Sequence, residues 1–269
     1  MKLIIFVLIL LISQTIASDK LIFGAISTIE PDLMKKKLSP VMKYLEKATG
    51  KKIEFQTGYN YNDTINKFAD GTFDIGLIGP APYVKTKTIN PDSINIIAGL
   101  KNAPGKPFQS VIISKKGSSI LKLSDIKNHR FAFGSPQSTL SYFVPMDMLI
   151  NAKVIKKIKR YDFLGRHDKV AQYVIMGKYD VGAVKKSVAD KYSKYIQIVE
   201  SSKPLADFMI VSSSSLDQKL VNKIKNALLS LKDIKTLSLL KKSIVGFEER
   251  QDSDYDDLRE IILNVRTYK

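Results

Sequence analysis

The stretch GSPQSTLSYFVP, which begins at Gly134, gathers hydroxyl side chains where an apolar run ends and a segment of helical spacing begins. Ser138, Thr139 and Ser141 lie within four positions, and Gly134 and Pro136 ahead of them favour a turn. Hydroxyls beside the free backbone N–H groups of a helix start can hold an oxyanion without a lysine. Ser138 could instead simply cap the helix, a role that Ser and Thr commonly take. Because three hydroxyls exceed the need of one cap, we predict an anion site.

A second stretch, FLGRHDKVAQYV, repeats the arrangement of an apolar run, a turn glycine and polar residues where a helix should begin. His167 falls at that start, so we expect it to point into the same cleft as Ser138; a surface or structural role is the alternative for a single histidine. A hydrolase built from Ser138, His167 and Asp168 is disfavoured. The G-x-S-x-G elbow is missing, and Asp168 is adjacent to His167 in the sequence. We therefore expect a binding protein and not an enzyme.

Further polar side chains follow earlier apolar runs. Tyr59 and Tyr61 lie in QTGYNYND, Tyr83 lies in GPAPYV, and Ser27 follows the first apolar run. A tyrosine is a neutral hydrogen-bond donor that suits a phosphoryl group, so each is a candidate ligand contact. The alternative for each tyrosine is packing as a half-buried loop aromatic.

The elements that must position these residues are short apolar strands alternating with amphipathic helices. The predicted strands cover residues 21–26, 52–55, 74–79, 94–100, 110–114, 130–134, 160–165, 180–184, 195–200 and 208–212. Strands that are apolar on both faces and separated by helices indicate an α/β fold whose sheets are covered on both sides.

An internal echo indicates two similar lobes. DGTFDIGLIG at 70–79 and MGKYDVGAVK at 176–185 share the order Gly, aromatic, Asp, β-branched, Gly. In open α/β sheets the ligand lies beyond the carboxyl ends of the strands, so we expect the two lobes to face each other across a cleft.

Composition limits the location and the partners. The chain starts MKLIIFVLILLISQTIAS, which predicts a signal peptide at 1–17 cleaved after Ala17, and its apolar run is too short to span a bilayer. With no cysteine and about 250 mature residues, the protein suits a bacterial periplasm.

The net charge of +17 suits anionic partners, but the lysines are dispersed and we expect no nucleic acid. No Walker loop, dinucleotide fingerprint or metal-ligand spacing is present, so we expect neither cofactor nor metal.

The blocks GAIST, DIGLIGPAPYV, SPQSTLSYFVP, GRHDKVAQYVIMGKYDVGAV and ESSKPLADFMIV carry a family resemblance over nearly the whole mature chain. The chain resembles the phosphate, phosphite and phosphonate substrate-binding proteins of bacterial ABC importers. The resemblance implies a type II periplasmic-binding-protein fold with a mixed, mostly parallel sheet in each lobe and a two-strand hinge. The first lobe would comprise 18–108 and 208–269, and the second 109–207.

The resemblance also implies the ligand contacts: the hydroxyls of the S-T-x-S segment, His167 and Tyr61 would hold the phosphonyl oxygens. The chain departs from the aminophosphonate pattern at Lys185, where an acid would hold the ligand's amine, and at Ile78, where a second tyrosine is expected. Lys185 would attract an anionic group instead. Asp207 matches a second amine-facing acid. Phosphate, phosphite or a non-amino phosphonate therefore fits at least as well as an aminophosphonate.

We thus expect a monomeric periplasmic protein that captures a small phosphorus oxyanion by hinge closure and delivers it to an ABC permease in the inner membrane. Two alternatives remain at this point. One is a sensor that presents its closed form to a signalling receptor. The other is a basic exported adhesin that uses its lysines on anionic surfaces.

Overall fold

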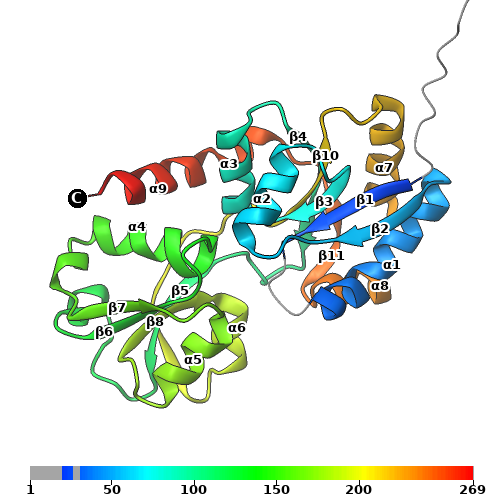
Figure 1. The fold of residues 1–269 in the computed structure, drawn as a ribbon. Coiled ribbons are helices and arrows are strands. Elements are labelled where there is room, and N and C mark those ends of the chain that lie inside the picture. The colour runs from blue at the N-terminus through cyan, green and yellow to red at the C-terminus, as the bar shows by residue number, and fades with distance from the viewer. Residues whose placement is uncertain (1–19, 27–30, 269) are drawn as a thin grey trace, which may run out of the picture.

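The computed structural model describes residues 20–26 and 31–268, and within them it forms two α/β lobes, each built on its own sheet (Figure 1). The predicted two-lobed α/β fold is confirmed. The expected signal peptide at 1–17 and the candidate Ser27 lie outside the described residues.

The first lobe contains a six-stranded sheet in the order β11-β4-β10-β3-β1-β2. Its strands are β1 (Lys20–Ala25), β2 (Lys52–Gln56), β3 (Ile75–Ile78), β4 (Ile94–Asn102), β10 (Met209–Ser213) and β11 (Ile244–Glu248). β1, β2 and β3 pair in parallel, whereas β10 pairs antiparallel with β3 and β4, and β11 antiparallel with β4. β11 is an addition to the predicted strands.

Helices cover both faces of this sheet, as strands that are apolar on both sides require. α1 (Pro31–Thr49), α7 (Gln218–Ser230) and α8 (Ile234–Leu240) share one hydrophobic core, and α2 (Tyr61–Ala69) and α3 (Pro80–Ile89) share the other. α2 and α3 follow the parallel strands β2 and β3, so they begin at the carboxyl ends of these strands, where ligands bind in α/β sheets.

The second lobe contains a five-stranded sheet in the order β7-β6-β8-β5-β9. Its strands are β5 (Ser110–Lys115), β6 (Arg130–Phe133), β7 (Arg160–Phe163), β8 (Val181–Lys185) and β9 (Ile196–Ser201). β6 pairs in parallel with β7 and β8, and β5 pairs antiparallel with β8 and β9. In this lobe antiparallel strand pairs are as frequent as parallel ones, and in the first lobe they are more frequent. The two sheets are therefore mixed, and not mostly parallel as expected. The cause is that β5 and β10, which follow the crossings, and the edge strand β11 run against their neighbours.

Helices also cover the second sheet. They are α4 (Val144–Asn151), α5 (His167–Ile175), α6 (Lys186–Lys191) and the short turns η1 (Leu123–Ile126), η2 (Thr139–Phe143) and η3 (Ile155–Lys157). α4 packs in one apolar core, and α5 and α6 pack in the other. η2 is a π-helical turn that continues directly into α4.

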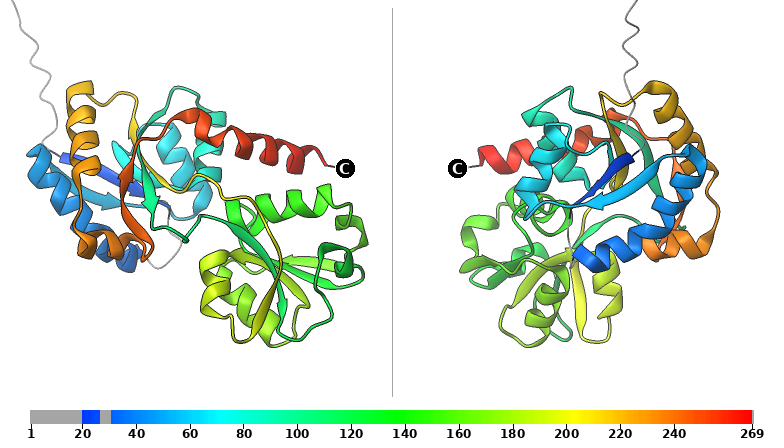
Figure 2. Two further views of the ribbon diagram at one scale, coloured as in Figure 1. Left: turned by 180° about the vertical axis from the view of Figure 1, so that it is seen from behind. Right: turned by 45° about the vertical axis from the view of Figure 1, so that its right-hand side comes forward.

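The chain passes between the sheets twice, in 103–109 and 202–208. The two segments run side by side, because the Leu205 N–H donates to the Phe108 carbonyl at 2.9 Å. After η4 (Asp252–Tyr255), helix α9 (Asp256–Thr267) extends from the first lobe along α4 of the second, as both views of Figure 2 show. The Asn264 amide donates to the Asp147 carboxylate of α4 at 2.6 Å.

The sequence echo occupies equivalent places in the two lobes. Gly71 and Gly177 have φ angles of 78° and 70°, the left-handed conformation that favours glycine. Asp74 and Asp180 each accept a hydrogen bond from a backbone N–H at the neighbouring strand, β1 in one lobe and β6 in the other. The repeated residues therefore make the same helix-to-strand turn twice.

Candidate functional site

A cavity of about 310 Å³ lies between the lobes, and both lobes and the crossing segment 103–109 contribute to its wall. Helix starts converge on it: the lining residues include the first residues or caps of helices at Tyr61, Gly79, Thr139, His167 and Lys186. Helix starts carry unpaired N–H groups and the positive end of the helix dipole. The cavity is therefore suited to a small anion.

Ser138 and Thr139 line the cavity, and their hydroxyls have separate partners. The Ser138 hydroxyl caps η2 by accepting from the Ser141 N–H at 3.2 Å. The Thr139 hydroxyl accepts from the Ala81 N–H of α3 at 3.0 Å and so links the two lobes. Because each hydroxyl oxygen acts as an acceptor in these bonds, each retains its own proton for donation.

The π-helical turn η2 follows from the same segment. The Phe143 N–H donates to the Ser138 carbonyl five residues earlier, at 3.1 Å. A π turn leaves one more N–H at the helix start without a partner inside the helix than an α turn does, and such turns are frequent at functional sites. The backbone of Thr139 and Leu140, which both line the cavity, supplies these groups.

Ser141 does not line the cavity. Its side chain is fully buried, and among the described residues its hydroxyl oxygen has no hydrogen-bond partner. It packs against the end of β6, where a Cβ on Gly134 would lie only 2.0 Å from it. The turn glycine at 134 thus serves close packing, and two of the three clustered hydroxyls remain at the cavity.

His167 lines the cavity as the first residue of α5. Its Nδ1 accepts a hydrogen bond from the Lys185 N–H at 3.0 Å, so the neutral ring carries its proton on Nε2. Burial of the ring, and secondly the Lys185 ammonium, lower the pKa of His167 to about 3. The imidazole is therefore neutral at physiological pH, and its Nε2–H is a hydrogen-bond donor.

The two tyrosines of QTGYNYND point in different directions. Tyr59 is 97% exposed and lies near Lys67, away from the cavity. Asn60 between them caps α2 by accepting from the Asp63 N–H at 3.0 Å, which turns Tyr61 inward to the cavity. The Tyr61 hydroxyl bonds to no residue that the structure describes, and burial raises the pKa of Tyr61 to about 12, so it remains a donor.

Tyr83 is not brought to the cavity. It is 1% exposed and packs against Tyr255, with ring centroids 5.4 Å apart. Its hydroxyl donates to the Asp252 carboxylate, and burial and this carboxylate raise the pKa of Tyr83. From α3, it is instead Gly79 and Pro82 that line the wall.

Asp207 lies behind the cavity wall in the crossing segment and is 2% exposed. Its carboxylate pairs with the Lys241 ammonium and also accepts from the Asn102 amide at 2.6 Å. The Asp207 carboxylate, which could otherwise bind a ligand's amine, is thus neutralised by Lys241. Asp207 serves as a buried structural pair near the hinge.

Lys185 lines the cavity at the end of β8, and Lys186 beside it lines the cavity as well. Sequence reasoning missed other lining residues of the first lobe and the crossings, notably Lys37, Lys241, Phe108 and Phe208. Phe108 and Phe208 meet edge to face at 5.9 Å and form an apolar part of the wall. These residues come from four distant segments, and no motif in the sequence connects them.

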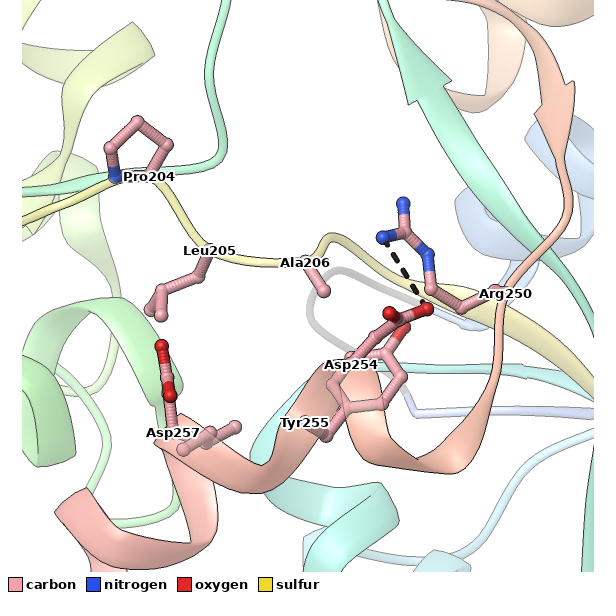
Figure 3. Close-up of a pocket in the computed structure, with 8 residues that line it drawn as sticks. Pro204, Leu205, Ala206, Arg250, Asp254, Tyr255 and Asp257 are labelled. Atoms are coloured by element: carbon pink, nitrogen blue, oxygen red, sulfur yellow. Dashed lines mark ion pairs between the residues drawn. The ribbon is translucent and has the colours of Figure 1, made fainter.

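A second cavity of about 180 Å³ lies between the crossing segment 202–208 and the start of α9 (Figure 3). Its charged residues are Arg250, Asp254 and Asp257, and Arg250 is paired with Asp254 at 3.8 Å and with Glu248. Because its one cation is already paired and a further carboxylate is present, this cavity is a poorer anion site than the larger one.

Within 20–26 and 31–268, no cluster of three or more His, Asp or Glu side chains is placed to hold a metal ion. No helix in that part of the chain is both long and apolar enough to cross a bilayer.

The chain matches a known protein family. Residues 23–255 match the family model described as the periplasmic substrate-binding protein of the phosphonate ABC transporter. The phosphate-import protein PhnD of Mycolicibacterium smegmatis is 24% identical over 257 residues, which cover 85% of this chain and 80% of the relative. The probable phosphite-binding protein PhnD1 of Prochlorococcus marinus is 28% identical over 235 residues, covering 80% and 78%.

The fold is shared with solved structures. PhnD1 of Prochlorococcus marinus in complex with methylphosphonate superposes with a TM-score of 0.78 at 25% identity, covering 92% of this chain and 98% of that one.

Proposed function

Because this chain belongs to the family of periplasmic phosphonate-binding proteins of ABC transporters, we propose that its interlobe cavity captures a phosphorus oxyanion for import. Relatives named for phosphate and phosphite, and a structural relative solved with methylphosphonate, support this class of ligand. The protein binds and releases its ligand without covalent change.

The observation that carries the proposal is the convergence of neutral donors on one cavity. The Ser138 and Thr139 hydroxyls with the start of η2 face it from the second lobe, together with the Nε2–H of His167. The Tyr61 hydroxyl faces it from the first lobe. Fixed dipoles and backbone N–H groups in a partly dry site can hold an anion without a paired ammonium.

Hinge closure follows from this two-sided arrangement. A ligand that contacts donors of both lobes binds the closed form more tightly than the open form, and so it shifts the population toward closure. The paired crossing segments at 103–109 and 202–208 support a hinge there. In this proposal one lobe comprises 18–108 and 208–269, and the other 109–207. The closed form is then recognised by the permease.

The location follows from the family, whose members serve ABC importers in the periplasm. In this proposal residues 1–17 are the export signal, cleaved after Ala17, and the mature protein acts as a monomer.

A thermal-shift experiment with methylphosphonate, phosphite, phosphate and sulfate tests the proposal. A ligand at 100 times its Kd stabilises the folded state by about 2.7 kcal/mol. This corresponds to an increase in Tm of several degrees for a chain of this size. We expect such an increase with at least one phosphorus oxyanion and a smaller one with sulfate. No increase with any of the phosphorus oxyanions would overturn the proposal.

A further inference from the structure

The cavity wall is rich in lysine. Lysine side chains reach it from both lobes and from the crossing segment, at Lys37, Lys106, Lys185, Lys186 and Lys241. Among the described lining residues, Asp190 is the one acid. A single tetrahedral oxyanion bound by neutral donors does not account for this excess of positive charge.

Two of these lysines already have a carboxylate partner. Lys186 pairs with Asp190 one turn along α6, at 2.7 Å. Lys241 pairs with Asp207 behind the wall. Their charges are therefore largely balanced within the protein.

Of the other three lysines, Lys106 is exposed, and Lys185 and Lys37 are half-buried in the wall. They approach the cavity from opposite lobes, Lys185 from the end of β8 and Lys37 from α1. In the described part of the chain neither lies within ion-pair distance of a carboxylate. Burial, then the ammonium groups of Lys241 and Lys37, lower the pKa of Lys185 more than the carboxylates of Asp207 and Asp168 raise it. Half-buried cations without a counter-ion are unfavourable, and a bound anion would relieve that cost.

The remainder of the wall suits a short carbon linker. Leu77, Leu100 and Leu240 line the cavity with the edge-to-face pair of Phe108 and Phe208. A volume of about 310 Å³ is at the small end of small-molecule sites and exceeds the space that a bare tetrahedral oxyanion fills.

We propose that Lys185 and Lys37 form a second anion subsite, and that the preferred ligand joins its phosphoryl group through a short carbon linker to a second anionic group, such as a carboxylate. This inference rests on the proposed function. Ligands that carry an ammonium in place of the second anion are disfavoured, because Lys241 already occupies the Asp207 carboxylate.

Calorimetric titration with three probes tests the subsite. Methylphosphonate carries the phosphoryl group alone, phosphonoacetate adds a carboxylate, and 2-aminoethylphosphonate adds an ammonium. We expect phosphonoacetate to bind at least tenfold more tightly than methylphosphonate, and 2-aminoethylphosphonate to bind more weakly than methylphosphonate. In Lys185→Met the advantage of phosphonoacetate over methylphosphonate should fall below threefold.

Lys37→Met provides an independent variant from the other lobe, with the same expected loss of the phosphonoacetate advantage. Lys194→Met is the matched control, because Lys194 is an exposed lysine of the second lobe away from the cavity. It should leave both affinities unchanged.

The outcomes separate the two proposals. Equal binding of methylphosphonate and phosphonoacetate by the unsubstituted protein would overturn the subsite and leave the proposed function intact. An equal loss of both ligands in Lys185→Met would also overturn it, because Lys185 would then hold the phosphoryl group. Failure of every phosphorus oxyanion to bind would overturn the proposed function itself.

Discussion

The backbone N–H of Lys185 donates to Nδ1 of His167 at 3.0 Å, and this bond fixes which ring nitrogen faces the cavity with a proton. It joins the start of α5 to the end of β8, so two elements of the second lobe orient one imidazole. His167 is thereby prepared as a neutral donor before any ligand arrives.

Replacement of His167 tests this donor. In His167→Asn the amide can still accept from Lys185, but the donor at the position of Nε2 is lost. In His167→Gln an amide N–H can reach that position. We therefore expect at least a tenfold loss of methylphosphonate affinity in His167→Asn and a smaller loss in His167→Gln, measured by calorimetry. Equal affinity of His167→Asn and the unsubstituted protein would remove His167 from the site.

The lowered pKa of His167 also predicts how stability depends on pH. The folded-state pKa of about 3 lies below the unfolded value of about 6.5, so folding favours the neutral ring. The stability contribution is full above pH 6.5 and is lost as the pH falls toward 3. Between pH 7.5 and pH 5, urea unfolding should show the unsubstituted protein losing about 1–2 kcal/mol more than His167→Gln. Equal losses in the two proteins would contradict a buried neutral imidazole.

The Thr139 hydroxyl, which accepts from the Ala81 N–H across the lobes, gives a matched pair of variants. Thr139→Val keeps the shape but removes the hydroxyl, and leaves the Ala81 N–H without its partner. Thr139→Ser retains the hydroxyl. We expect methylphosphonate affinity to fall at least tenfold in the valine variant and less than threefold in the serine variant. Similar affinities for the two would show that the hydroxyl is dispensable.

Tyr61 provides the donor from the opposite lobe. Because its hydroxyl bonds to no described residue, Tyr61→Phe should not destabilise the ligand-free protein. It should weaken methylphosphonate binding by about tenfold, which is equivalent to roughly 1.4 kcal/mol for one hydrogen bond. Thermal unfolding and calorimetry measure the two effects separately. Tyr59→Phe is the control and should change neither, because Tyr59 is almost fully exposed. An unaltered affinity in Tyr61→Phe would exclude this contact.

The Asp207–Lys241 pair predicts a stability effect near the hinge. Lys241→Met leaves a buried carboxylate without its cation and should destabilise the protein by about 3 kcal/mol. Adding Asp207→Asn in the double variant should recover much of that loss, because the uncompensated charge is gone. Chemical unfolding measures both. If the single and double variants were equally stable, the pair would have no structural role.

Local sequence patterns could predict most of the fold. Apolar runs and turn glycines marked strands such as β3 and β8, and the echoed aspartates and glycines marked the same turn in both lobes. β11 was missed. Its five residues, interrupted by Gly246, carry little periodic signal, and only pairing with β4 defines them as a strand.

Side-chain direction at the site was harder to predict. Ser138, Thr139, Tyr61, His167 and Lys185 reach the cavity because helix starts place them there. Ser141, Tyr59 and Tyr83 share those segments, yet helix phase and capping turn them elsewhere. The π turn at Thr139 and the cap at Asn60 decide this, and neither is visible in composition.

The Lys241 partner of Asp207 could not be predicted either. The two residues are 34 positions apart and meet only because α8 ends beside the crossing segment. Long-range pairs of this kind depend on tertiary packing, which no local pattern encodes.

A crystal structure of the protein with methylphosphonate would show whether neutral donors of both lobes hold the ligand. We expect phosphonate oxygens between the lobes, within hydrogen-bond distance of the backbone N–H and hydroxyl of Thr139, the Nε2 of His167 and the hydroxyl of Tyr61. A phosphonate bound outside the interlobe cavity, or held there by lysine ammonium groups without these neutral donors, would contradict it.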